Sequence, residues 1–249
     1  MTDQCRLLHD FEQVVTFIND RAEVVSVHTA DIGMGPFSLQ VDHLSFETMR
    51  RVGDEGIDRI SSLRSLVGPD PFGPDEKACQ LWNARPDWSR FTADMLADIP
   101  HELPDDIDHA MCRLHQAIFE KNRAGVGQAS KTIIGRGIGL TPTGDDVLMG
   151  TIFALHVLGW ERDMMQIIGE QAAGSTTSLS AAFLQAAVAG EATEPWHNLL
   201  AGKAKALENL LSVGATSGKD AWIGFVKMLQ VARCRMQTPK IGNKSQVAG

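Results

Sequence analysis

The most informative stretch of this chain is Gly135-Arg-Gly-Ile-Gly-Leu-Thr-Pro-Thr-Gly-Asp-Asp-Val-Leu-Met-Gly150. Five of its sixteen residues are glycine, and an apolar run follows at once. Glycine accepts positive φ and lets a backbone amide approach a ligand closely. The first turn of a helix also carries N–H groups without intrahelical acceptors, which bind anions. The stretch therefore predicts a ligand-facing loop that leads into a helix.

The two carboxylates in this stretch have two interpretations. Thr143-Gly-Asp-Asp146 fits a capping box, with Thr143 as N-cap and Asp146 in a structural position. A cap does not explain the three glycines before it, so we also expect Asp145 and Asp146 to be catalytic. They would take a proton or, if the site uses a metal, hold a cation such as Mg²⁺. Because Asp146 has the capping-box position, we expect Asp146 to be at least partly structural and Asp145 to be functional. Gly144→Val is expected to remove ligand binding and to spare the fold.

A second copy of the pattern lies 74 residues further along the chain. Thr143–Gly150 and Ser217–Gly224 both read hydroxyl, Gly, charged, Asp, three mainly apolar residues and Gly. Recurring capping boxes would explain most of this. The shared final glycine is not part of capping chemistry, and it predicts close helix–helix approach in both copies. A third hydroxyl-rich segment, Gly174–Ser180, also precedes a predicted helix and would either cap it or donate to an oxyanion.

If the three helix starts converge, they form a pocket of amides and hydroxyls that suits a small anionic substrate. The residues expected to bind it are Gly137, Gly139, Thr141, Thr143, Gly144, Ser178, Thr216, Ser217, Gly218, Lys219 and Asp220.

Composition narrows the class of protein. Of the 249 residues 43% are hydrophobic and 22% charged, which is typical of a globular chain with a real core. The net charge of −8, without a basic run, argues against nucleic-acid binding. Four scattered cysteines without a CxxC pair, and no signal-peptide pattern, favour the cytoplasm. The longest apolar run, Val147–Trp160, is too short to span a membrane.

The predicted fold class is α+β, with a β-rich N-terminal unit (residues 1–105), a helical domain (106–238) and a disordered tail (239–249). In the first unit we expect an amphipathic helix over residues 1–20 and strands at residues 24–29 and 37–41. We also expect a strand end at residues 52–54 and an irregular, proline-rich segment at 68–76. In the second, helices are expected from residue 107 and over residues 147–160, 161–173, 177–189, 196–211 and 221–235, with Gly190 ending the helix at 177–189.

Three runs together resemble one bacterial family: residues 137–150, 179–190 and 214–224. It is the family that contains the AllH-type subunit of oxamate carbamoyltransferase. The resemblance extends over residues 22–226 and is strongest from 133 to 224. It implies transfer of a carbamoyl group between phosphate and oxamate in the breakdown of allantoin and purine nitrogen.

The resemblance also implies partners, either other enzyme subunits or further copies of the chain. Arg136 and Lys219 are the cations nearest the two loops, and the arginine cluster usual for carbamoyl phosphate is absent from the sequence. Two alternatives stay open. One is a non-catalytic scaffold or metabolite-sensing subunit, and the other is a carboxylase-like or lyase enzyme acting on a small carboxylic acid.

Overall fold

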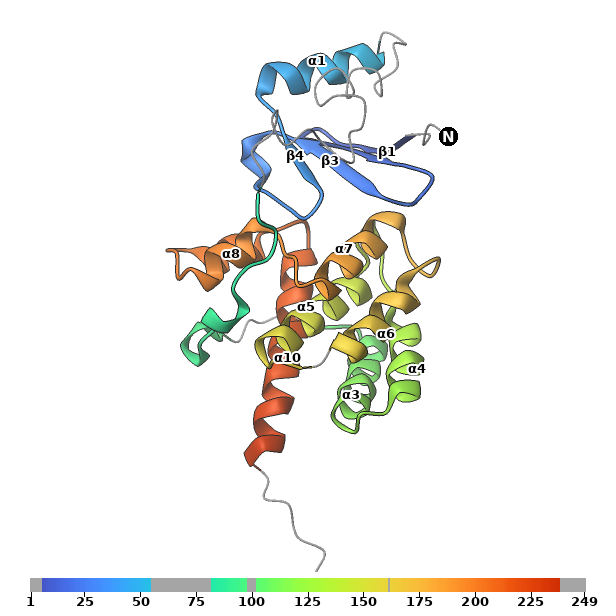
Figure 1. The fold of residues 1–249 in the computed structure, drawn as a ribbon, viewed down its shortest axis with the longest axis vertical. Coiled ribbons are helices and arrows are strands. Elements are labelled where there is room, and N and C mark those ends of the chain that lie inside the picture. Colours follow the sequence, from blue (N-terminus) through green and yellow to red (C-terminus); the bar gives the residue numbers. More distant parts are fainter. Residues whose placement is uncertain (1–5, 55–81, 98–101, 161, 238–249) are drawn as a thin grey trace, which may run out of the picture.

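The computed structural model describes residues 6–54, 82–97, 102–160 and 162–237. Its strands are β1 (Arg6–Asp10), β2 (Val14–Ile18), β3 (Val24–His28) and β4 (Ser38–Gln40). Its α-helices are α1 (His43–Asp54), α3 (Asp105–Phe119), α4 (Arg123–Ile133), α5 (Thr143–Val157), α6 (Arg162–Ala172), α7 (Ser178–Val188), α8 (Glu194–Leu200), α9 (Ala206–Leu211) and α10 (Ser217–Gln237). A four-stranded sheet thus precedes a mainly helical region, which confirms the α+β class (Figure 1).

The sheet has the order β1-β2-β3-β4, with β1, β2 and β3 antiparallel and β4 parallel to β3. Strands β3 and β4 confirm the strands predicted at residues 24–29 and 37–41. The predicted helix over residues 1–20 is wrong, because a β1–β2 hairpin occupies the described part of that segment. The β-branched residues of β2 favour a strand. Both faces of β2 are buried, so the sequence shows no alternation that would have indicated a strand.

Helix α1 covers one face of the sheet (Figure 1). Phe46 and Met49, three residues apart, pack with Phe17 and Val27 in a small core. The predicted strand end at residues 52–54 is wrong, because these residues belong to α1. The sequence signal for this helix is Asp42, whose carboxylate accepts a hydrogen bond from the backbone amide of Ser45 at 2.9 Å.

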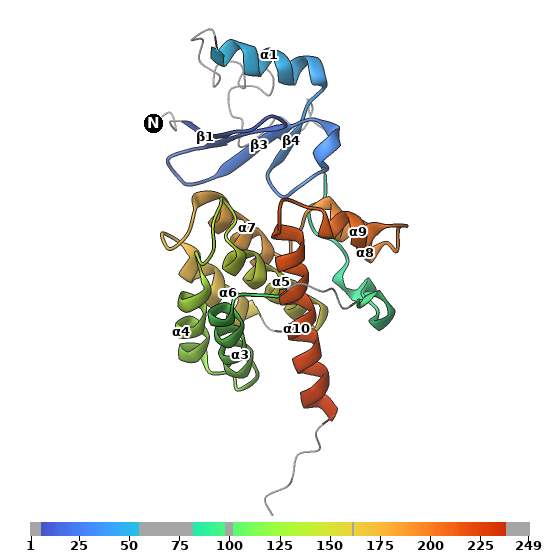
Figure 2. The same ribbon diagram turned by 180° about the vertical axis from the view of Figure 1, so that it is seen from behind.

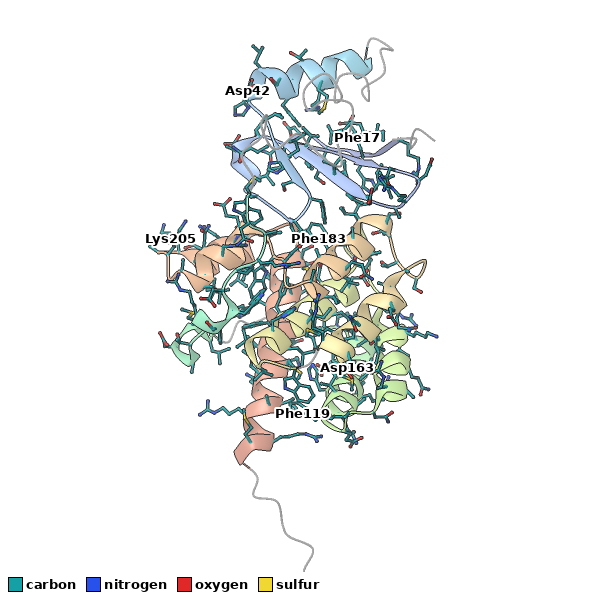
Figure 3. The ribbon with its side chains drawn as sticks, in the orientation of Figure 1. Phe17, Asp42, Phe119, Asp163, Phe183 and Lys205 are labelled. Atoms are coloured by element: carbon teal, nitrogen blue, oxygen red, sulfur yellow. The ribbon has the colours of Figure 1, made fainter. Side chains whose placement is uncertain are left out.

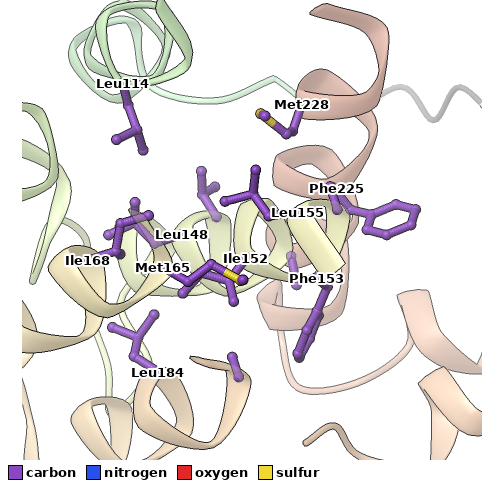
Figure 4. Packing of buried hydrophobic residues seen from close by; sticks show 14 of the residues in the cluster. Leu114, Leu148, Ile152, Phe153, Leu155, Met165, Ile168, Leu184, Phe225 and Met228 are labelled. Atoms are coloured by element: carbon purple, nitrogen blue, oxygen red, sulfur yellow. The ribbon is translucent and has the colours of Figure 1, made fainter. Parts of the chain in front are cut away.

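Helix α5 runs through the middle of the helical region. It is buried almost without interruption from Gly144 to Leu155, as expected for a helix that is apolar on all sides. It is surrounded by apolar side chains from four other helices: Leu114 of α3, Met165 and Ile168 of α6, Leu184 of α7, and Phe225 and Met228 of α10 (Figure 4). The predicted helices at α3, α5, α6, α7 and α10 are confirmed.

The single helix predicted over residues 196–211 is wrong. The chain leaves the helix after Leu200 and starts again at Ala206, which gives the two short helices α8 and α9. Gly202 and Lys205 in this connection have φ of 66° and 59°. An α-helix cannot continue through two left-handed residues. The helical spacing of the leucines continues across this connection, so the sequence pattern did not reveal that the helix is broken there.

The sheet and the helical region are joined by specific contacts. The rings of Phe37, before β4, and Phe183 of α7 lie 4.5 Å apart between centroids, and Phe183 lies at the sheet side of the helices (Figure 3). The amide of Met34 donates to the Glu194 carboxylate at 3.0 Å. The face of the sheet opposite α1 is turned toward α7 and the start of α10 in both views (Figures 1 and 2).

Residues 82–97 pack on the helical region as an irregular strap that contains two 3-10 turns, Trp88–Arg90 and Ala93–Met95. The indole of Trp88 stacks on Phe153 of α5 and donates to the carbonyl of Gly190 at 3.0 Å. Near the end of the strap, Ala97 accepts a hydrogen bond from the indole of Trp222 in α10 at 2.9 Å. The division at residue 105 stays a prediction, although the strap before it packs on the helices. The irregular segment 68–76 and the tail 239–249 lie outside the described residues. Within the described chain, no helix is both long and apolar enough to cross a membrane.

Candidate functional site at three helix starts

The loop between α4 and α5 exposes its backbone. Gly135, Gly137 and Gly139 have φ of 71°, 114° and 97°, in the region that favours glycine. The amides of residues 137–141 donate to no acceptor among the residues that the structure describes. Residues 136–139 are exposed, and Ile138 at the tip is 94% exposed. The loop therefore carries a row of N–H groups that are unpaired within the described chain, and those of residues 137–139 lie at exposed positions.

Asp145, in the first turn of α5, holds the start of this loop in position. Its side chain is buried, and both of its carboxylate oxygens accept hydrogen bonds. Oδ1 accepts from the amide of Gly135 at 2.9 Å. Oδ2 accepts from the hydroxyls of Thr176 and Ser180, the second at 2.8 Å. Asp145 thus ties the start of the loop to the start of α7. The expectation that Asp145 is less structural than Asp146 does not fit these contacts.

The start of α7 contacts the same loop a second time. Thr177 is the N-cap of α7, and its hydroxyl oxygen accepts from the amide of Ser180 at 3.1 Å. The same hydroxyl donates to the carbonyl of Leu140. Ser178, predicted to bind substrate, is exposed beside this cap.

The start of α10 closes the group. The hydroxyls of Thr141 and Ser217 are hydrogen-bonded at 2.8 Å. Thr216 and Lys219 are exposed on either side of Ser217. The first turns of α5, α7 and α10 therefore meet at the loop of residues 135–142, and we call this group of four segments the helix-start site.

The predicted capping box is wrong. Pro142 occupies the N-cap position of α5, and no side chain caps the helix. Thr143 is already helical, so its hydroxyl does not play the predicted role. Asp146 is directed to the hydroxyls of Ser217 and Thr141 instead.

Asp146 is buried in an unusual state for a carboxyl group. Its exposed fraction is 3%, and its Oδ2 has no hydrogen-bond partner among the described residues. Burial raises the pKa of Asp146 to about 8, against the opposing hydrogen bonds of Ser217 and Thr141. The neighbouring charges of Asp220 and Asp145 raise it further. Asp146 is therefore mostly protonated at pH 7.

The sequence repeat is a structural repeat. A Cβ added to Gly150 would lie 1.8 Å from the carbonyl oxygen of Ala221, and one added to Gly224 would lie 2.0 Å from that of Val147. The fifth residue of each copy thus meets the eighth of the other. Such reciprocal contact is the signature of a two-fold relation. The predicted close approach of the two helices is confirmed.

The repeat also includes the helix before each copy. Gly144 packs on the carbonyl of Ile133 at the end of α4, and Gly218 packs on that of Leu210 in α9. Their added Cβ atoms would lie 2.0 and 1.9 Å from these oxygens. The expectation that Gly144→Val spares the fold is therefore wrong, because the clash is with backbone and no side chain can rotate to relieve it.

A known protein family matches the part of the chain that contains these helix starts. Residues 133–229 match the family model described as oxamate carbamoyltransferase subunit AllH. The AllH resemblance is confirmed over this segment. No solved structure matches the chain. The AllH segment begins at the end of α4 and extends into α10, so it contains the whole helix-start site and both close glycine contacts.

Within the AllH segment the predicted substrate-binding residues fall into two groups. One group is exposed at the loop or helix ends: Gly137, Gly139, Ser178, Thr216 and Lys219. The other group is buried or half-buried beneath them: Thr141, Thr143, Gly144, Ser217, Gly218 and Asp220. The first group is accessible to a ligand. The second includes the residues whose contacts join the helix starts to one another or to the preceding helices: Thr141, Ser217, Gly144 and Gly218.

Sequence reasoning missed the partners of Asp145. Thr176 and Ser180 lie 31 and 35 residues from it in the chain, and Gly135 lies ten residues away. Hydroxyls before a helix indicate a cap, but no local pattern says which carboxylate they bind. The hydroxyl-rich stretch before α7 was the available signal.

The site suits an anion better than a metal. No group of three or more His, Cys, Asp or Glu side chains able to hold a metal ion occurs in the described chain. Both oxygens of Asp145 already accept hydrogen bonds from protein donors. The positive ends of three helices also meet here, and they disfavour a cation. The residues present therefore do not fit Mg²⁺.

Proposed function

We propose that this chain is a subunit of a carbamoyltransferase that binds small anionic substrates at the helix-start site. The substrates we propose are carbamoyl phosphate and oxamate. We also propose that the reaction belongs to nitrogen metabolism in the cytoplasm. The observation that carries the proposal is the convergence of α5, α7 and α10 on a loop whose amides at residues 137–141 are unpaired within the described chain.

The chemistry of these groups matches a phosphoryl or carboxylate oxygen. Backbone amides and helix N-termini stabilise such oxygens without requiring a net positive protein. Ser178 and Thr216 add exposed hydroxyls, and Arg136 and Lys219 add exposed cations near the loop. The charge of −8 means that binding relies on this local arrangement.

The proposed reaction joins the amide nitrogen of oxamate to the carbamoyl carbon and releases phosphate. The nitrogen loses a proton, and the bond from carbon to the phosphate oxygen breaks. The amides of the loop would stabilise the negative charge on the departing phosphate. Asp145 would fix the loop in position, since it holds Gly135 and the start of α7. A catalytic contact of Asp145 or Asp146 with substrate stays a prediction, because their exposed fractions are 1% and 3%.

The scarcity of cations supports the need for a partner subunit. Arg136 and Lys219 are few for a doubly charged phosphate, and the matched family is named as a subunit. We propose that a partner chain supplies the further charges and covers the exposed loop. The burial of both aspartates favours one alternative, a subunit that senses the metabolite and leaves catalysis to its partner.

Calorimetry on the isolated chain tests the binding part of this proposal. The chain is titrated with carbamoyl phosphate, phosphate and oxamate, and compared with Lys219→Ala and the control Lys203→Ala. Both lysines are exposed, but only Lys219 lies in the first turn of α10. We expect Lys219→Ala to weaken binding about tenfold, the usual size of one charge-assisted hydrogen bond, and Lys203→Ala to leave it unchanged. Equal affinities in all three proteins would contradict a contribution of Lys219 to anion binding at the helix-start site.

Turnover separates the catalytic reading from the sensing reading. The reaction of carbamoyl phosphate with oxamate is followed for the isolated chain and for the chain with its co-purified partner. Activity only in the complex supports the proposed subunit. Full turnover by the chain alone would contradict the need for a partner. If Lys219→Ala weakens anion binding but the complex keeps its full activity, the result would favour the sensing subunit.

A further inference from the structure

The connection before α5 is longer than its counterpart before α10. In each copy of the repeat, a glycine of the long helix packs on a carbonyl of the preceding helix. Ten residues lie between Ile133 and Gly144 in the first copy. Only seven lie between Leu210 and Gly218 in the second. Because the second copy makes the same contact without them, the three additional residues are not needed for the packing.

Three residues at the tip of the first connection stand between two anchors. The carbonyl of Arg136 accepts a hydrogen bond from the amide of Gly144 at 2.8 Å. The carbonyl of Leu140 accepts one from the hydroxyl of Thr177. Residues 137–139 lie between these bonds, and we call them the loop tip. The two anchors hold the loop tip as a fixed projection.

The loop tip presents an apolar side chain to solvent. Ile138 is 94% exposed, more than any other large hydrophobic residue in the described chain. The glycines on both sides of it let another backbone approach closely. A small anion has no apolar surface with which to cover an isoleucine, whereas a protein pocket does. Because the loop tip is already held in place, little conformational freedom is lost when it docks.

A pocket that suits one apolar side chain lies beyond the other end of α5. Its volume is about 280 Å³, just below the range of roughly 300–1,000 Å³ that is usual for ligand pockets. Leu158, Trp160 and Met164 give it an apolar wall. The full lining, which we call the end pocket, is Lys121, Leu158, Gly159, Trp160, Asp163 and Met164. Helix α5 has 15 residues and so separates the end pocket from the loop tip by about 22 Å. Ile138 therefore cannot fill the end pocket of its own chain.

The charges at the end pocket complement those at the loop tip. Lys121 is exposed, and it forms no ion pair with any residue that the structure describes. Its φ is 53°, in the region where glycine is the usual residue after a helix. A lysine there is strained, so its side chain is retained at a cost in stability. Asp163, on the same rim, offers Arg136 of the loop an opposite charge.

We propose that Ile138 of one chain docks in the end pocket of a second copy, and that Lys121 of the second copy thereby joins the anion site at the loop. This lysine adds a third cation to Arg136 and Lys219. The contact joins unlike surfaces, so it repeats from chain to chain and gives a ring or an open filament. The role of Lys121 rests on the proposed function. It specifies the chain that covers the loop, and turnover still requires a different subunit.

The mass of the purified full chain in solution tests the docking. Size-exclusion chromatography with light scattering should give the wild-type chain a mass of several chains. Ile138→Asp should have the mass of one chain, because a carboxylate does not enter an apolar pocket. Leu44→Asp is the matched control, since Leu44 of α1 is 78% exposed and lies outside both surfaces, and it should keep the wild-type mass. A monomeric wild-type chain, or an assembled Ile138→Asp variant, would overturn the proposal.

Mixing two defective variants tests the specific pairing of the loop tip with the end pocket. Trp160→Ala removes part of the pocket wall, so this variant should also be monomeric. It keeps Ile138, and the Ile138→Asp variant keeps its end pocket. The mixture should therefore form a dimer with one chain of each kind. A mixture that stays monomeric, or a Trp160→Ala variant that assembles like the wild type, would show that this pairing is wrong.

Cross-linking provides a test that does not depend on the folding of Trp160→Ala. A photoreactive apolar amino acid is placed at position 138 of the otherwise wild-type chain. Mass spectrometry should find cross-links between chains to Leu158, Trp160 or Met164. Cross-links to other surfaces alone would overturn the docking.

The contribution of Lys121 is measured separately by calorimetry with phosphate. Lys121→Ala should keep the wild-type mass and bind phosphate about tenfold more weakly, the usual size of one charge-assisted hydrogen bond. Lys205→Ala is the matched control, because Lys205 is also exposed and has a φ of 59°. Unchanged affinity in assembled Lys121→Ala would overturn the role of this lysine. Absence of phosphate binding in the assembled wild-type chain would refute the anion site itself, while the masses and cross-links would still decide the docking.

Discussion

Replacing Gly150 by alanine tests the helix crossing on which the site is built. The added Cβ would lie 1.8 Å from the carbonyl oxygen of Ala221 and 2.9 Å from the amide nitrogen of Phe225. Ordinary contact begins at 3.4 Å, so the two backbones must separate by roughly 1.6 Å at this point. Both are helical backbone, and no side chain can rotate to make room.

The expected loss of stability follows from two opposing effects. Overpacking of a tight interior costs about 1–3 kcal/mol and more when backbone must move, while Gly→Ala in a helix gains about 1 kcal/mol. Because helical backbone must move, the cost should lie at or above the top of its range, so we expect a net loss of about 2 kcal/mol or more from a typical total of roughly 5–15 kcal/mol. The crossing also carries Ser217 and Asp146, so the variant should bind anions less well.

Urea unfolding followed by circular dichroism measures this loss. Gly127→Ala in α4 is the matched control, because its added Cβ would meet only Ile167 at 3.5 Å and Gln171 at 4.0 Å. The control should gain about 0.5–1 kcal/mol from helix propensity. If Gly150→Ala gains stability as the control does, the close approach of α5 and α10 is wrong.

Three further predictions concern single side chains. Asp145→Asn should lower the free energy of unfolding by about 2–4 kcal/mol in urea titrations, because buried donors lose a charged acceptor; an unchanged midpoint would contradict its anchoring role. Thr177→Val should cost about 1 kcal/mol by removing the cap of α7 and its bond to the Leu140 carbonyl, and a loss of zero in the same assay would exclude both contacts. Burial and the charge of Lys227 lower the pKa of His115 to about 4 from 6.5, so stability should fall as the pH drops from 6.5 toward 4. His115→Gln should reduce that fall in melting temperature, and an equal fall would show that another group causes it.

The helical region was largely predictable because its periodic patterns are long. The apolar run that follows Asp146 indicates a central helix whatever its neighbours are, and α5 is that helix. The N-terminal unit was harder. The apolar spacing of residues 8–18 fits a helix as well as a hairpin, and only pairing with β3 decides between them. The break between α8 and α9 was likewise hidden, since a left-handed lysine leaves no sequence signal.

The position of the candidate site could be predicted from the sequence, but the roles of its residues could not. Glycines before a helix indicated the loop, and the repeat indicated the α5–α10 approach. The roles of Asp145 and Asp146 depend on contacts with α7 and α10, which lie far along the chain. The capping-box pattern indicated that Asp146 stabilises the helix start and that Asp145 has a functional role instead. The structure instead gives Asp145 three donors and leaves one oxygen of Asp146 without a partner among the described residues.

The central claim is that the amides of residues 137–141, which have no acceptor in the part of the chain that the structure describes, bind an anion between three helix starts. Amide NMR of the nitrogen-15-labelled chain, titrated with phosphate and then with carbamoyl phosphate, tests it most directly. Hydrogen bonding to an anion should shift the amide signals of Gly137 and Gly139 strongly and saturably, together with those at the starts of α7 and α10. Saturable shifts confined to other parts of the chain, or no shifts with either ligand, would contradict the account.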